Sequence, residues 1–399
     1  MVISESMKDL VANSSAIRKL FEEGIAMAKV IGRENVYDFS LGNPSVPAPA
    51  RVADTIRRIL DEQDSLYVHG YMQNAGYDDV RTCVADYLNR AFNAGMTAAN
   101  VMMAAGAAGA LNCIMRVLVN PGDEIIAFAP YFGEYRNYAA NFGGRIAAVP
   151  VNPDGSFQLN LEAFPEYVNE KTKAVILNSP NNPTGVIYSG ETLDRFNELL
   201  IEAEKKAGHP IYVICDEPYR ALAYDNETVP YMPDHVKNTI LCESFSKTLS
   251  LPGERIGYIA VPSDVDAFDE IMGALICANR ALGYINAPSL FQLVVAECLD
   301  EKTDIAAYDR NRQLLYDALT KDGFTCVRPQ GAFYLFVKSP TEDDTDFVNE
   351  GKKLGILMVG MKSWGCPGYV RLAYCCDYHM IERSLPAFEK LADVYGLRK

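Results

Sequence analysis

Residues 244–255 contain the side chains with the clearest chemical potential, directly after an apolar run that predicts a β-strand. Lys247 stands among small and hydroxyl-bearing residues, between Ser244 and Arg255. A lysine amine forms a Schiff base with a carbonyl group once burial or a nearby cation lowers its pKa. Ser244 and Arg255 are suited to hold a phosphate, the arginine through charge-assisted hydrogen bonds. A lone lysine in a serine-rich loop is usually just exposed, but here serine, lysine, glycine and arginine occur together at one strand end, where sheet ligands gather.

Two other charged residues stand where apolar strand patterns would bury them. Asp216 follows the apolar run 211–215, and Arg371 lies inside the run 369–373. A buried charge is costly unless it is paired, and a guanidinium fits a carboxylate through two parallel hydrogen bonds. Both residues are therefore candidates for binding charged parts of a ligand. The alternatives stay open at this point: Asp216 also suits a turn cap, and Arg371 an edge strand at the surface.

Small-residue and turn motifs follow two further predicted strands. The run 104–110 consists of alanine and glycine and leads into a predicted helix. Small residues at a helix N-terminus let backbone N–H groups close around an anion, although packing alone explains many alanine-rich helix starts. The Asn-Pro and Thr-Gly pairs at 182–185 predict a rigid turn.

Residues 244–255 resemble the pyridoxal-phosphate attachment motif of class I and II aminotransferases, the fold-type I family that includes aspartate aminotransferase. Every position of that motif is matched, and further motifs follow in family order from Gly42 to Arg371. The resemblance implies a transamination between an amino acid and a 2-oxo acid with pyridoxal 5'-phosphate as cofactor. Lys247 would hold the cofactor as a Schiff base and move protons as general base and acid.

The resemblance also implies the cofactor contacts. Asp216 would pair with the pyridinium nitrogen and keep it protonated, so that the ring acts as an electron sink. Phe132 would stack on the ring, while Asn182 and Tyr219 would contact its phenolic oxygen. The phosphate would be held by Gly106, Ala107, Ala108, Ser244 and Arg255. Ala108 lacks the hydroxyl that some family members place there, so one side-chain contact to the phosphate is missing.

The substrate contacts implied by the family are fewer. Arg371 would bind the substrate α-carboxylate, with Gly42 and Asn182 lining the same pocket. Arg280 lies near the family position that binds a distal carboxylate from the partner subunit, but its spacing to Asn286 differs by one residue from that pattern. A basic helix end explains Arg280 equally well. We expect dicarboxylic substrates first, with aromatic or aliphatic amino acids as the alternative.

Tyr71 matches a family tyrosine that reaches the phosphate in the partner subunit, and with Lys247 and Asp216 it completes the implied catalytic set. Each site would then need two chains, so we expect a homodimer. Another reaction on the same scaffold, a cystathionine-type C–S lyase, stays open. A ligand-sensing domain of a transcription regulator and an inactive scaffold are the remaining rivals.

The elements that must position these residues alternate in type. Short β-rich runs occur at 101–104, 124–129, 145–151, 173–178, 211–216, 239–243 and 255–261, and helical patterns include 107–119, 132–140 and 191–206. The alternation predicts an α/β fold, and the fold-type I resemblance implies a mainly parallel seven-stranded sheet between helices. A further helix from 264 to about 279 is predicted to open with a capping box of Ser263 and Asp266.

The two chain ends predict a smaller α+β domain. The N-terminal part holds a helix and a strand at 36–41, and the C-terminal part holds helices at 290–299, 305–321 and 380–394 with strands at 332–337, 356–359 and 369–373. We therefore expect an N-terminal arm and part of the small domain at 1–49, a large cofactor-binding domain at 50–289 and a C-terminal small domain at 290–399.

The composition excludes several other classes. Of 399 residues, 49% are apolar and 22% charged, which suits a large globular core. A net charge of −15 disfavours nucleic acid as a partner. We find neither an apolar run of about 18 residues nor a signal-peptide pattern, so we expect a cytoplasmic protein without membrane contact. The 10 cysteines show no C-x-x-C spacing and there are 4 histidines, so no metal site is expected.

Overall fold

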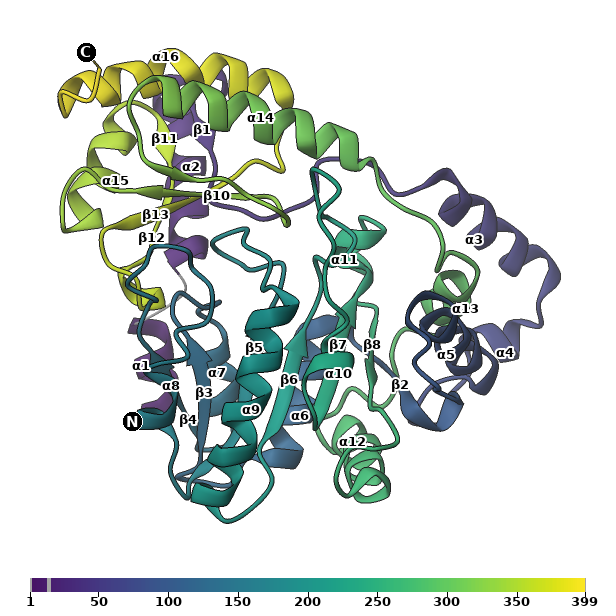
Figure 1. Ribbon diagram of the computed structural model, residues 1–399. Helices are drawn as coiled ribbons and strands as arrows, with labels where there is room; N and C mark the ends of the chain where they lie inside the picture. Colours follow the sequence, from purple (N-terminus) through teal and green to yellow (C-terminus); the bar gives the residue numbers. More distant parts are fainter. Residues whose placement is uncertain (1, 13–15, 399) are drawn as a thin grey trace.

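A seven-stranded sheet forms the centre of the larger body in the computed structural model, which describes residues 2–12 and 16–398 (Figure 1). Its strands lie in the order β2 (Val101–Ala104), β8 (Gly257–Ala260), β7 (Thr239–Ser244), β6 (Tyr212–Asp216), β5 (Thr172–Asn178), β3 (Glu124–Phe128) and β4 (Arg145–Val149). Only β8 runs against its neighbours β2 and β7. The predicted α/β fold with a mainly parallel seven-stranded sheet is confirmed.

Helices cover both faces of this sheet, which explains why its strands read as continuous apolar runs. Successive strand residues alternate between two apolar clusters. Ile214 and Cys242 pack with α6 (Gly106–Leu118) and α12 (Phe268–Ala281). Val213 and Leu241 pack on the other face, with α5 (Asp78–Phe92), α9 (Gly190–Ala207) and α13 (Ser289–Glu297).

The predicted capping box before α12 is wrong. The helix begins at Phe268, after Ala267, whose φ of 58° marks a left-handed turn and whose side chain caps nothing. The two proposed capping side chains are used elsewhere. Ser263 Oγ accepts a hydrogen bond from Asn100 Nδ2 at 2.8 Å, and the Asp266 carboxylate accepts one from Asn238 Nδ2 at 3.0 Å. Two buried asparagines therefore outcompete the helix N-terminus for these groups.

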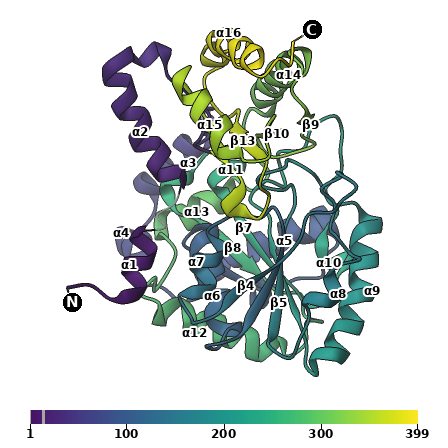
Figure 2. The ribbon, with the colours of Figure 1, turned by 90° about the vertical axis from the view of Figure 1, so that its left-hand side faces the viewer.

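The smaller body combines both ends of the chain and lies above the large sheet in Figure 2. Strand β1 (Tyr37–Asp38) pairs in parallel with β11 (Ile356–Leu357), and a four-stranded antiparallel sheet has the order β12 (Val359–Gly360), β13 (Tyr369–Ala373), β10 (Tyr334–Lys338) and β9 (Cys326–Val327). Helices α2 (Ala16–Ile31), α14 (Ile305–Lys321), α15 (Asp344–Lys353) and α16 (Tyr378–Val394) belong to this body. The β13 and α14 bounds match the prediction, whereas the strand expected at 36–41 is limited to β1.

Residues 50–100 hold helices that we did not predict from the sequence. These are α3 (Ala50–Glu62), α4 (Ser65–His69) and α5, and α3 packs against α13. Helix α7 (Tyr135–Ala140) begins three residues later than predicted, and α1 (Glu5–Ala12), α8 (Phe164–Tyr167) and α10 (Met232–His235) are short. Within the described part of the chain, no helix is both long and apolar enough to cross a membrane.

Candidate active site

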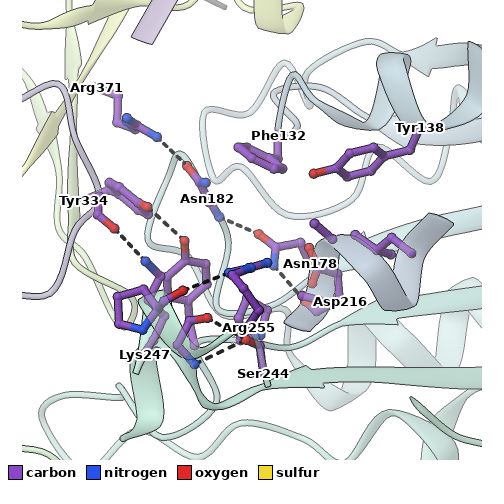
Figure 3. Close-up of a pocket in the computed structure, with 18 residues that line it drawn as sticks. Phe132, Tyr138, Asn178, Asn182, Asp216, Ser244, Lys247, Arg255, Tyr334 and Arg371 are labelled. Atoms are coloured by element: carbon purple, nitrogen blue, oxygen red, sulfur yellow. Dashed lines mark hydrogen bonds between the residues drawn. The ribbon is translucent and has the colours of Figure 1, made fainter. Parts of the chain in front are cut away.

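A cavity of about 270 Å³ lies between the carboxyl ends of β5, β6 and β7 and the smaller body (Figure 3). Parallel strands bring their carboxyl ends to one edge of a sheet, which is where ligands bind in such folds. Most of the predicted site residues line the cavity: Gly42, Ala107, Ala108, Phe132, Asn182, Asp216, Tyr219, Ser244, Lys247, Arg255 and Arg371. The structure thus gathers residues that are more than 300 positions apart in the sequence.

Lys247 projects into this cavity from α11 (Phe245–Thr248), a single turn that follows β7 directly. Ser244 caps the turn by accepting a hydrogen bond from the backbone N–H of Ser246 at 3.2 Å. The Lys247 amine donates to the Gly42 carbonyl at 2.6 Å. Burial lowers the pKa of Lys247 to about 8, and the nearby cations Arg371 and Arg255 act in the same direction. At pH 7 roughly a tenth of this amine is therefore neutral, and hence nucleophilic, which is far more than for a lysine with an ordinary pKa.

Asp216 is a buried carboxylate without a cationic partner among the described residues. It ends β6 and is 5% exposed. Its Oδ2 accepts a hydrogen bond from the Tyr135 hydroxyl at 2.5 Å, whereas Oδ1 has no partner. Burial raises the pKa of Asp216 to about 7, with the neighbouring Glu217 adding to the effect. Such a group fits a protonated ring nitrogen, which would supply the missing donor and the missing positive charge.

An anion site forms where α6 begins. Ala107 and Ala108, in the first turn of this helix, line the cavity together with Ser244 and Arg255. Gly106 does not line it but makes the arrangement possible. Its φ is +68°, and a Cβ there would lie 2.7 Å from Nη2 of Arg255. The glycine thus lets the guanidinium approach the helix N-terminus, where backbone N–H groups and positive charge together suit a phosphate.

Arg371 provides a second anion-binding group at the opposite end of the cavity in Figure 3. It lies on β13 and is 1% exposed. Its guanidinium donates to Asn182 Oδ1 at 3.1 Å and to the Ser40 carbonyl at 2.6 Å, while Nε has no partner. The ring of Tyr334 lies 4.4 Å from the guanidinium carbon. No carboxylate of the described residues pairs with Arg371, so a ligand carboxylate fits here.

Sequence reasoning missed the tyrosines that support these groups. The Tyr334 hydroxyl lies 2.8 Å from that of Tyr219, and Tyr135 holds Asp216 as described above. Nothing local marks these residues among the 23 tyrosines of the chain. Tyr334 was included in a predicted strand, but its proximity to Tyr219 depends on how the two bodies meet.

Besides Gly106, two predicted site residues do not line the cavity. Tyr71 is 94% exposed, and Arg280 is exposed in the last turn of α12. Both are expected to act in the site of a partner subunit. A single chain does not test that expectation, so both assignments stay predictions.

In the cofactor-free protein, we expect Asp216 to make stability fall as the pH rises. Its folded-state pKa of about 7 lies above the ordinary 3.8, so between these values the folded state holds more protons than the unfolded state. The contribution of Asp216 to the free energy of unfolding is then largest below about pH 4 and decreases toward pH 7. Urea denaturation at pH 5 and pH 7.5 should show a smaller decrease for Asp216→Asn than for the wild type. The exposed control Asp54→Asn should keep the wild-type decrease, and an equal decrease in all three proteins would contradict the assignment.

Comparisons with known proteins agree with this geometry. Residues 34–388 match the family model described as aminotransferase class I and II. A putative aminotransferase of Bacillus subtilis is 30% identical over 93% of this chain and 94% of its own length, and a probable aspartate/prephenate aminotransferase of Aquifex aeolicus is 28% identical over 89% and 91%. The crystal structure of an amino transferase from Eubacterium rectale is 45% identical, with a TM-score of 0.96 and 99% of both chains covered. Aspartate aminotransferase from Thermus thermophilus with maleate is 25% identical, with a TM-score of 0.82 and coverage of 94% and 96%. The chain therefore belongs to the class I and II aminotransferases, enzymes that transfer an amino group between an amino acid and a 2-oxo acid.

Proposed function

We propose that this aminotransferase uses pyridoxal 5'-phosphate held by Lys247 and prefers dicarboxylic substrates of the aspartate and glutamate type. One observation carries the cofactor assignment. A single cavity holds an amine with a lowered pKa, a buried carboxylate that lacks a cationic partner, and a helix N-terminus with an arginine beside it. These three groups match an aldehyde, a ring nitrogen and a phosphate.

When bound, pyridoxal phosphate supplies an aldehyde carbon that reacts with amines and a ring that takes up electrons released from the substrate Cα. Each residue that would hold the cofactor faces one part of it. Asp216 would face the ring nitrogen, Phe132 the ring, and Asn182 and Tyr219 the phenolic side. The phosphate would be held by Gly106, Ala107, Ala108, Ser244 and Arg255.

The chain's own residues then orient the substrate and move its protons. Arg371 binds the α-carboxylate and so fixes the direction of the Cα–H bond. The Lys247 amine, once free, takes that proton and returns it to a neighbouring carbon as general base and then acid, for which a pKa of about 8 is well suited. Gly42 and Tyr334, from the smaller body, close the cavity beside the amine.

Substrate preference rests on the relatives. Several are named aspartate aminotransferase, and the Thermus enzyme was crystallised with the dicarboxylate maleate. One relative from Thermococcus litoralis is instead named aromatic-amino-acid aminotransferase, so aromatic or aliphatic donors are the second candidate. Arg280 from a partner subunit is our candidate for binding the distal carboxylate of a dicarboxylic substrate. A C–S lyase side reaction is tested in the same assay.

The proposed working unit is a cytoplasmic homodimer in which Tyr71 reaches the phosphate of the partner's site. Full exposure of this tyrosine leaves it available for that contact, and all ten cysteines are free thiols, which suits a reducing compartment. We propose the domain division 1–49, 50–289 and 290–399. Helix α13, which this division assigns to the 290–399 unit, packs its apolar residues on α3 and α5 of the larger body.

A donor and acceptor panel tests the proposed reaction. We expect aspartate with 2-oxoglutarate to give glutamate faster than tyrosine or leucine does, and cystathionine to release little pyruvate. Lys247→Ala should lose the visible cofactor band and reduce turnover by roughly 10³-fold or more. The exposed control Lys205→Ala should retain both. Wild-type turnover by Lys247→Ala would overturn the cofactor assignment, whereas faster turnover with aromatic donors would overturn only the substrate preference.

Mixed dimers test the shared site. Tyr71→Phe and Lys247→Ala each damage both sites of their own homodimer if Tyr71 acts across the interface. A heterodimer of the two variants, isolated through two different affinity tags, then combines both defects in one site and leaves the other intact. We expect about half of the wild-type kcat per dimer. If Tyr71 acts within its own chain, every site of the heterodimer carries one defect and activity stays low.

A further inference from the structure

Tyr334 lies between two groups that have separate roles in the proposed reaction. It begins β10 in the smaller body and is 3% exposed. Its ring lies below Arg371, with the guanidinium carbon 4.4 Å from the ring centre (Figure 3). Its hydroxyl lies 2.8 Å from the hydroxyl of Tyr219, which follows β6 in the larger body. One side chain thus contacts both the proposed carboxylate site and a residue of the proposed phenolic side, and no step described above uses its hydroxyl.

The surroundings of Tyr334 hold its hydroxyl in this position. The hydroxyl oxygen packs so closely on Gly42 that a Cβ there would clash with it. The rings of Tyr334 and Tyr219 meet edge to face, with an interplanar angle of 79°. Two residues before Tyr334, the Ala332 carbonyl accepts a hydrogen bond from the Tyr224 hydroxyl at 2.5 Å. The start of β10 is therefore tied to the larger body, and the two hydroxyls stay side by side.

Either hydroxyl of the pair can donate the shared hydrogen bond, and the charge nearby favours Tyr334 as the donor. Burial raises the pKa of both tyrosines. For Tyr334 the Arg371 charge is the main opposing influence, and its pKa is about 12. The pKa of Tyr219 is raised well above its ordinary value. A cation stabilises the phenolate of the ring beside it, and the more acidic of two hydroxyls is the better donor.

This direction leaves the Tyr219 proton free. Among the described residues, Tyr334 is the one hydrogen-bond partner of the Tyr219 hydroxyl. Tyr219 also lines the cavity that Lys247 enters. If Tyr334 donates, the Tyr219 hydroxyl accepts on one side and can donate to a ligand on the other.

We propose that Tyr334 is a positioning residue, which donates to the Tyr219 hydroxyl and so directs the Tyr219 proton to the phenolic oxygen of the bound cofactor. This inference rests on the proposed function, in which Tyr219 faces that oxygen. A hydroxyl that accepts a hydrogen bond becomes a stronger donor in turn. Tyr334 thus acts through Tyr219, and Arg371 strengthens the effect because its charge polarises Tyr334.

The consequence is a lowered pKa of the visible cofactor band. The proton of the Schiff base is shared with the phenolic oxygen, and its loss leaves that oxygen more negative. A hydrogen-bond donor at the oxygen stabilises the deprotonated form and therefore lowers the pKa at which the band changes. Removal of the Tyr334 hydroxyl should weaken the donor and raise this pKa.

A spectroscopic pH titration of the holoenzyme measures the pKa of the band. Tyr334→Phe keeps the ring below Arg371 and should raise this pKa by about half a pH unit. Tyr219→Phe should raise it further. Adding Tyr334→Phe to Tyr219→Phe should then have no additional effect, because the two residues act in series. The matched control Tyr224→Phe removes another buried hydroxyl, which contacts the segment before Tyr334 but does not line the cavity, and should keep the wild-type pKa.

A thermal melt of each variant establishes that it is folded. An unchanged or lowered pKa of the band in Tyr334→Phe would overturn the inference, because Tyr219 would then be the donor of the pair. An equal rise in Tyr224→Phe would also overturn it, since loosening of the start of β10 would explain both results. So would a rise from Tyr334→Phe that persists when Tyr219 is already Phe. A wild type without a titrating band would instead contradict the proposed cofactor, and with it the function on which this inference rests.

Discussion

Buried charge without a partner is the constraint around which this structure is arranged. Asp216 and Arg371 are almost completely buried, and each keeps a polar atom that no described residue satisfies. Lys247 is held in the same cavity with a lowered pKa. Such groups reduce the stability of the empty protein. In the proposed complex, a ring nitrogen would compensate Asp216, a carboxylate would compensate Arg371, and an aldehyde would react with Lys247. The fold therefore accepts a lower stability of the cofactor-free protein in return for selective binding of a ligand with these three groups.

The fold holds these charges in place through two bodies rather than one. The parallel sheet brings Asp216 and the Lys247 turn to neighbouring strand ends, since β6 and β7 are paired in register. The smaller body then brings Arg371 on β13 and the Gly42 carbonyl from the opposite side. Asn182, from the turn after β5, joins the two bodies by accepting from Arg371. A shift of either body would therefore alter both the carboxylate site and the position of the lysine amine.

The parts of the site that local patterns predict are those where a rare residue type stands at a strand end. Asp216 and Arg371 were predicted because a charge at the end of or inside an apolar run demands a partner, and Lys247 because serine, lysine, glycine and arginine occur together after a strand. Tyr135 and Tyr334 were not, because their roles arise from contacts between distant segments. The predicted capping box at Ser263 is wrong for the same reason. The Ser263 hydroxyl accepts a hydrogen bond from Asn100, which lies more than 160 residues earlier in the sequence. The contributions of Tyr71 and Arg280 depend on a second chain and so stay predictions.

Covalent trapping tests most directly whether Lys247 is the residue that carries the cofactor. The holoenzyme is treated with borohydride, which fixes the cofactor to whichever amine holds it, and is then digested and analysed by mass spectrometry. We expect the added mass on the peptide that contains Lys247, and we expect aspartate added before the reductant to diminish it. The same mass on another lysine, with Lys247 unmodified, would contradict the central assignment.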